Sequence, residues 1–270
     1  MSCRAIGSSI GRVAAMTLRY WYLLRKSWPR LVELVYWPTL NMIVWGLLTF
    51  YFNSGETTFV AKIGGLLAAV MLWDVLLRGQ LGFTYSFLEE VWSRNIANLM
   101  MSPLRPAEMA ASLMVMSLIR LVLGMTPVTV LAAVLFGFNI YSLGVPLIAF
   151  FACLVVTSWA IGLIVAGLVL RNGMGAESFA WSAMMLLLPV SCVYYPVAAL
   201  PAWLQPVAWS VPPTYVFEGL RAVLLEGTVR IDLMVEAFAL NLVYLGAGFA
   251  IFLALVESAR RKGSILAMGE

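Results

Sequence analysis

The sequence predicts an all-α polytopic membrane protein. The chain of 270 residues is 63% hydrophobic and only 11% charged, which lies far outside the composition of soluble globular proteins. Its apolar residues form long continuous runs and not the alternating pattern of a membrane β-barrel. Short polar stretches separate these runs. We therefore expect six transmembrane helices, an amphipathic interfacial helix before them, a short helix in the loop between spans 2 and 3, and re-entrant helices between spans 5 and 6.

Three parts follow along the chain: an interfacial helix over residues 1–30, a six-span domain over 31–258 and a basic tail over 259–270. Projected at 100° per residue, the basic side chains of the first part fall on one side and its apolar ones on the other. The basic set is Arg4, Arg12, Arg19, Lys26 and Arg30, and the apolar set is Ile6, Ile10, Val13, Trp21 and Leu24. This pattern predicts a helix in the membrane surface, with its basic face toward acidic head groups.

The six spans are long apolar runs bounded by polar turns. They cover residues 31–52, 63–87, 110–138, 145–170, 179–195 and 233–256, and the polar turns cover 53–58, 139–144 and 171–177. The fifth span is the shortest. One membrane domain accounts for all of them.

The polar stretch 88–108 lies between the second and third spans, on one membrane face. Glu89 and Glu90 favour a helix N-terminus, and Pro103 and Pro106 end one helix and begin the next. Apolar residues recur between them at roughly helical spacing: Val91, Trp92, Ile96, Leu99 and Met100. We interpret the stretch as a short amphipathic helix that another protein could push. The alternative is an ordinary interfacial loop helix.

Residues 195–215 are too rich in proline for one straight helix and too apolar for an aqueous loop. Such backbone is tolerated at membrane depth only where protein shields it or where it lines a cavity. We read it as a broken, re-entrant helical pair, followed by a helix over 217–226. Tyr195, Trp203 and Tyr215 are candidate gate-lining aromatics, although anchoring in the membrane interface is an equal alternative.

The basic residues set the orientation. Of 17 Lys and Arg residues, 12 fall in the N-terminal helix, the 88–108 stretch, the 171–177 turn and the tail. The opposite loops hold Lys62, Arg221 and Arg230. By the positive-inside rule, both termini and the 88–108 stretch lie in the cytoplasm.

Three ionisable residues fall within spans: Asp74, Arg78 and Arg120. Counted from the loop, Asp74 and Arg120 lie at similar depth, and an unpaired charge there costs at least about 2.5 kcal/mol. We therefore predict that Asp74 pairs with Arg120, with Arg78 as the competing partner. The pair serves either to fix the helical hairpin or to contact cargo.

The sequence argues against catalysis. It has no histidine, its three cysteines are isolated, and no glycine-rich loop followed by Lys and Ser or Thr is present to bind nucleotide. We expect no catalytic residue, no metal site and no cofactor in this chain. Nor does the net charge of +4 imply nucleic acid, because membrane proteins concentrate basic residues in their cytoplasmic loops.

With these elements in order, the chain resembles the permease subunit of ABC-2 type exporters, which include nodulation-factor, drug and polysaccharide export permeases. Residues 94–106 are similar to the family's cytoplasmic coupling segment, and 195–204 with 212–215, Glu218 and Arg221 resemble its re-entrant helices. Trp92-Ser93-Arg94-Asn95 replaces the usual acidic-basic-glycine-threonine signature.

The resemblance implies a homodimeric permease in the bacterial inner membrane, in contact with lipid. It also implies two separate ATP-binding subunits that hold ATP and magnesium, and an amphipathic, lipid-linked or drug-like substrate. The implied site residues fall into two groups. The ATPase-coupling residues are Glu89, Glu90, Trp92, Arg94, Asn95, Asn98 and Arg105, and the gate or substrate-path residues are Tyr195, Pro196, Trp203, Pro212 and Tyr215.

Two other classes of protein are alternatives. An ion-coupled secondary transporter would keep ionisable residues and broken helices near the midplane, where only the three intramembrane charges qualify. An intramembrane enzyme would need a nucleophile with a base, or a metal set, and is the weaker alternative.

Overall fold

The computed structural model describes residues 3–52 and 60–262, and every regular element in this part is helical. The predicted turn at 53–58 and the end of the basic tail lie outside the described residues. The α-helices are α1 (Cys3–Lys26), α2 (Trp28–Phe52), α3 (Val60–Trp92), α4 (Ile96–Met101), α5 (Pro106–Phe136), α6 (Val145–Asn172), α7 (Ser178–Val190), α8 (Gln205–Trp209), α9 (Pro212–Arg221) and α10 (Ile231–Lys262). Shorter elements are the 3-10 helices η2 (Ile140–Leu143), η3 (Met174–Glu177) and η4 (Val197–Ala199), and the π-helix η5 (Ala222–Glu226).

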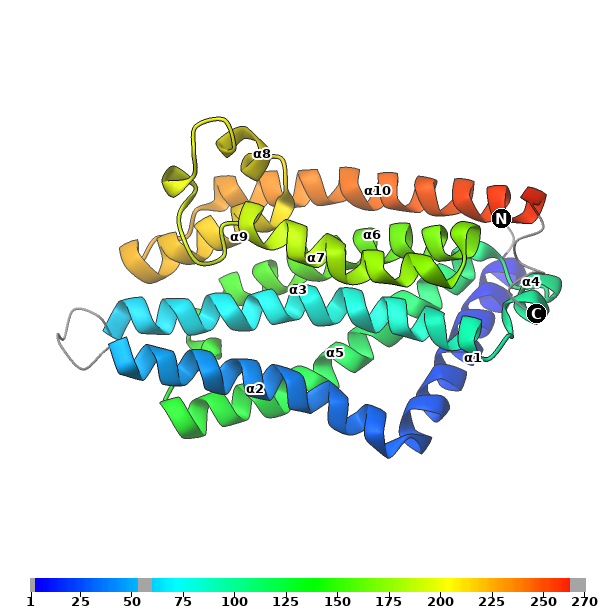
Figure 1. Cartoon of the computed structure of the whole chain (residues 1–270), viewed down its shortest axis with the longest axis horizontal. Coiled ribbons are helices and arrows are strands. Elements are labelled where there is room, and N and C mark those ends of the chain that lie inside the picture. Colours follow the sequence, from blue (N-terminus) through cyan, green and yellow to red (C-terminus); the bar gives the residue numbers. More distant parts are fainter. Residues whose placement is uncertain (1–2, 53–59, 263–270) are drawn as a thin grey trace.

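The long helices run side by side along the longest axis of the molecule (Figure 1). At one end, α1 crosses beneath the bundle close to α4, and the last described turns of α10 arrive at the same end. Arg260 of α10 contacts the sulfur of Met100 in α4. We call this end the α4 end. The opposite end carries α8 and the turns around it, and we call it the α8 end.

Five described helices are long and apolar enough to cross a membrane: α2, α3, α5, α6 and α10. The fifth predicted span is α7, which has only 13 residues and reaches about 20 Å, less than the hydrocarbon thickness of a bilayer. The chain then continues through η4, α8, α9 and η5 before α10. The structure therefore confirms an all-α polytopic membrane protein, while the count of six spans stays a prediction.

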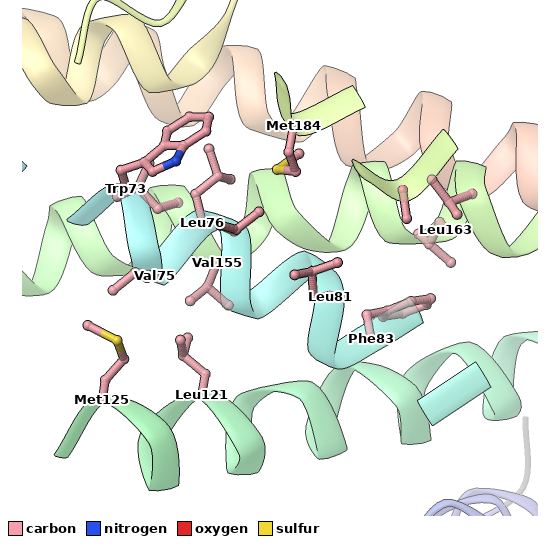
Figure 2. Packing of buried hydrophobic residues seen from close by; sticks show 14 of the residues in the cluster. Trp73, Val75, Leu76, Leu81, Phe83, Leu121, Met125, Val155, Leu163 and Met184 are labelled. Carbon is pink, nitrogen blue, oxygen red and sulfur yellow. The ribbon is translucent and has the colours of Figure 1, made fainter. Parts of the chain in front are cut away.

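Helix α3 forms the centre of the bundle. In its apolar stretch 89% of the residues are buried, the largest share among the five long helices. Figure 2 shows Trp73, Leu76 and Leu81 of α3 among side chains from the surrounding helices, with Leu121 and Met125 directed toward it from α5. Because α3 is packed on all sides, the residues of its last turn are held firmly.

Helices α6 and α10 pack closely along an extensive contact. A Cβ placed on Gly248 of α10 would lie 2.7 Å from the carbonyl oxygen of Ala160 in α6. Further along the same contact, the Thr157 hydroxyl donates to the side-chain oxygen of Asn241 at 2.7 Å. The small residues let the two backbones approach, and the buried hydrogen bond fixes their register.

The contact between α2 and α5 rests on a proline and a glycine. Pro38 has no N–H, so the carbonyl of Leu34, four residues earlier, loses its helical partner. Gly124 of α5 lies against this carbonyl, and a Cβ added there would be 2.8 Å from the oxygen. The proline therefore frees a carbonyl that only a glycine can approach.

Candidate functional site

The site is built around the break between α3 and α4. Helix α3 ends in a Schellman motif: the N–H of Arg94 donates to the carbonyl of Val91, and that of Asn95 to the carbonyl of Glu90. Arg94 occupies the left-handed position with φ +53°, where glycine is usual. The chain thereby reverses direction and starts the six-residue α4.

The sequence predicted that Glu89 and Glu90 favour the start of a helix, and this is wrong. Both residues lie in the last turns of α3. Carboxylates near a helix C-terminus are unfavourable for the helix dipole. Both residues are also buried, with 8% and 1% of their surface exposed. They are stabilised here because cations from other helices surround them.

Glu89 joins three helices. Its Oε1 lies 2.7 Å from Arg120 Nη2 of α5 and 3.0 Å from Arg30 Nη1 of α2. The Arg120 side chain is 5% exposed, whereas that of Arg30 is 41% exposed. The inner pair is therefore shielded from water and the outer pair is solvated.

Glu90 and Glu108 bind α1. Glu90 Oε1 lies 2.9 Å from Arg19 Nη1, and its Oε2 accepts from the Asn95 side chain at 2.8 Å. Glu108, in the first turn of α5, accepts from Arg12 Nε at 2.8 Å and from the Ser9 hydroxyl at 2.6 Å. Glu108 also accepts from the backbone N–H of Arg105, which caps the start of α5. The hydrogen bond to Glu108 raises the pKa of Arg12 above its ordinary value.

These contacts form three separate groups of ion pairs, which we together call the ionic network: Arg12 with Glu108, Arg19 with Glu90, and Arg30 and Arg120 with Glu89. The network ties α1 and α2 to both sides of the α3–α4–α5 loop. The prediction that the basic face of the first helix points to lipid head groups is therefore wrong for Arg12 and Arg19, which face protein carboxylates. The buried stripe beside them is Met16, Tyr20 and Leu24.

The segment from Trp92 to Arg105, which we call the α4 loop, also presents an outer surface. Trp92, Arg94, Asn98 and Arg105 are exposed, and Asn95 is partly exposed. Ile96 is buried and holds α4 against the bundle. Of the predicted coupling residues, the two glutamates thus face inward as anchors and the others lie at or near the surface.

The predicted pair of Asp74 and Arg120 is wrong. Arg120 packs beside Gly82 and pairs with Glu89, whereas Asp74 lies eight residues from Gly82, about 12 Å further along α3. Asp74 accepts from the side chain of Asn41 in α2 at 3.1 Å. The prediction assumed that residues equally far from the loop in sequence lie at the same height in the bundle. This assumption fails because α3 and α5 cross and because α3 continues as far as Trp92.

At the α8 end, Arg221 holds the turn after α7. Its guanidinium donates to the carbonyls of Cys192 and Tyr195, and it lies 3.1 Å from Glu218. Glu218 in turn accepts from the backbone N–H of Val197 at 2.7 Å. Three polar groups of this irregular backbone, the carbonyls of Cys192 and Tyr195 and the N–H of Val197, thereby find side-chain partners.

The predicted gate residues lie around this turn. The Tyr195 hydroxyl donates to the carbonyl of Pro189 at 2.6 Å, and that of Tyr215 to the carbonyl of Trp209 at 2.8 Å. Pro212 begins α9 and is buried, Pro196 is exposed, and Trp203 is 75% exposed. The tyrosines brace the loop, and Trp203 is the aromatic that projects from it.

A family model described as ABC-2 type transporter matches residues 14–225, which include α2 to α9, the residues of the ionic network except Arg12, and the turn held by Arg221. The chain belongs to the ABC-2 type transporter family. No curated protein matches the chain. This ABC-2 protein is therefore a multi-pass membrane subunit of an ABC transporter, a transport component that pairs with an ATP-binding subunit.

Sequence reasoning missed the partners of the glutamates. It placed Arg12, Arg19 and Arg30 on one helical stripe but did not match them to the carboxylates at the ends of the second and third spans. The sequence did contain a signal for these ion pairs, because carboxylates at the ends of apolar spans need a nearby cation. Among the described residues, no group of three or more His, Cys, Asp and Glu could hold a metal ion.

Proposed function

We propose that this ABC-2 protein is the permease of an ATP-driven exporter built from two permease copies and two ATP-binding subunits. It lies in the bacterial inner membrane with both termini in the cytoplasm, and it moves an amphipathic, lipid-linked or drug-like substrate outward. ATP and magnesium belong to the partner subunits. The observation that carries the proposal is the α4 loop, which is exposed on its outer side and tied by ion pairs on its inner side.

The outer side supplies a docking surface. Trp92, Arg94, Asn98 and Arg105 combine an aromatic ring, two guanidinium groups and an amide within one short loop. Large aromatic and arginine side chains dominate binding energy at protein interfaces. The excess of basic residues at this end supports its cytoplasmic placement.

The inner side supplies a path for motion. A push on α4 reaches Glu89 and Glu90 directly, because they belong to the turn that ends α3. From there the ion pairs lead to α1 through Arg19 and to α2 and α5 through Arg30 and Arg120. Closure of the ATP-binding subunits thereby moves several helices at once.

The test is charge reversal at the docking surface. Arg94→Glu should abolish transport while ATP hydrolysis and membrane insertion persist, because the partner loses a cationic contact. Arg94→Gly removes the side chain but keeps the left-handed turn, which costs a non-glycine residue about 1–2 kcal/mol. It should also impair transport, without loss of the folded protein.

The matched control is Arg171→Glu, which reverses an exposed charge at the α4 end outside the loop. It should leave coupling unchanged. Transport and ATP hydrolysis are measured in proteoliposomes with the ATP-binding subunit that copurifies. Full transport by Arg94→Glu at normal expression would refute the docking assignment.

A further inference from the structure

A cavity of about 250 Å³ lies between α2, α3 and α5 near the α4 end. Its wall combines charged, aromatic and apolar side chains. The lining residues are Arg30, Glu33, Leu34, Arg78, Leu81, Gly82, Tyr85, Glu89, Trp92, Arg120, Leu121, Gly124, Met125 and Glu177. Trp92 and Glu33 are exposed and lie at the rim, whereas Leu81, Arg120 and Leu121 are buried and form the floor.

The lining holds three arginines and three glutamates, but its inner part holds two guanidinium groups, of Arg78 and Arg120, and one carboxylate, of Glu89, while Arg30, Glu33 and Glu177 lie toward the rim. Arg30 and Arg120 share the single carboxylate of Glu89. Arg78 is partly buried, and among the described residues no carboxylate lies within ion-pair distance of it. Asp74, one turn away on α3, accepts a hydrogen bond from Asn41 and attracts Arg78 electrostatically without forming an ion pair with it.

Two buried donors in this wall also lack acceptors. The Nε atoms of Arg78 and Arg120 are buried and bond to nothing in the described part of the chain. The corresponding unfilled acceptor is a single atom, Glu89 Oε2. Charged groups within spans are costly and usually mark a path for cargo. The rim carboxylates Glu33 and Glu177 remain available to accept from hydroxyl groups of a bound molecule.

We propose that this cavity binds the anionic, phosphate-bearing headgroup of an amphiphile, with Arg78 as the main contact. Guanidinium groups match the geometry of phosphate oxygens. At about 30 Å³ per water the cavity corresponds to roughly eight waters, enough for a phosphate but not for a lipid. Leu81, Leu121 and Met125 form an apolar part of the wall, against which the first carbon atoms of the chain would lie.

The inference rests on the proposed export function, because it names the class of cargo. It is tested by binding alone, without ATP or the partner subunit. The full chain in neutral detergent is mixed with equal amounts of dioleoyl phosphatidic acid and dioleoyl glycerol, which differ only in the phosphate. Retained lipid is counted by native mass spectrometry for the wild type, Arg78→Met and the control Arg171→Met.

We expect the wild type and Arg171→Met to retain phosphatidic acid over the glyceride, and Arg78→Met to bind it about ten-fold more weakly. If Arg78→Met does not fold, Arg30→Met at the partly exposed rim replaces it and should also weaken retention. The proposed site would be overturned if all variants retained phosphatidic acid equally, or if Arg171→Met lost as much of it as Arg78→Met. Displacement of the lipid by millimolar inorganic phosphate would show that the ligand is a free anion and would overturn the proposal that it is an amphiphile.

The two proposals can fail separately. Loss of phosphatidic acid preference with intact coupling to the ATP-binding subunit overturns only the cargo class. Specific binding at Arg78 with no effect of Arg94→Glu on transport overturns only the docking of α4.

Discussion

The buried pair of Glu89 and Arg120 provides the most stringent test of the ionic network. The two side chains are 6% and 5% exposed and lie 2.7 Å apart, so removal of one partner leaves a charge away from water. Breaking a pair of this kind costs about 3–5 kcal/mol. We expect Glu89→Gln to reach this range, and Arg120→Gln to cost somewhat less because Arg30 still neutralises Glu89. Arg30→Gln should cost at most about 1 kcal/mol, since its side chain is 41% exposed.

The double variant Glu89→Gln with Arg120→Gln should be more stable than the sum of the single effects, by about 2 kcal/mol or more. Unfolding free energies are measured by titration of the purified chain with dodecyl sulfate in mixed micelles. The control is the cycle of Asp74→Asn with Arg120→Gln, which should be additive within about 0.5 kcal/mol because the two residues do not touch. Additive effects of Glu89 and Arg120 would refute the network.

Two further predictions concern packing and topology. Gly124→Ala places a Cβ against the Leu34 carbonyl and should destabilise the chain by about 1–3 kcal/mol in the same titration. The control Gly11→Ala should be neutral or stabilising, because a Cβ at this position meets nothing within 4 Å. Equal effects of the two substitutions would contradict the close contact between Gly124 and Leu34. Trp203→Cys should react with an impermeant maleimide added outside intact cells, because position 203 is 75% exposed, while the native thiol of Cys192 stays unreactive because it is fully buried. Reaction of the Trp203→Cys variant only from the cytoplasmic side would contradict the orientation.

The sequence predicted what depends on local pattern. The long apolar runs gave the helices α2, α3, α5, α6 and α10, and Pro103 and Pro106 correctly separated α4 from α5. The broken segment with α8 and α9 also followed from its prolines. These features depend only on local composition and backbone chemistry, so they can be predicted from one sequence.

What failed depends on how helices cross. Glu89 and Glu90 have the composition of a helix start, but Arg94 in a left-handed turn ends α3 after them. Asp74 and Arg120 lie at similar distances from the 88–108 stretch in sequence, but α3 and α5 do not run in register. Arg12 lies 96 residues before its partner Glu108, and only the folded arrangement of α1 across the α4 end brings the two together.

The contact of α6 with α10 sets where the protein can bend. Gly248 lies against the Ala160 carbonyl and Gly167 against Leu255, so sliding either helix by a fraction of a turn would drive backbone into backbone or side chain. The buried bond between Thr157 and Asn241 resists the same displacement. The helices α6 and α10 therefore behave as one rigid unit. In the proposed transport cycle, motion that the ion pairs pass on from the α4 loop would therefore move α1, α2 and α5 relative to this pair of helices.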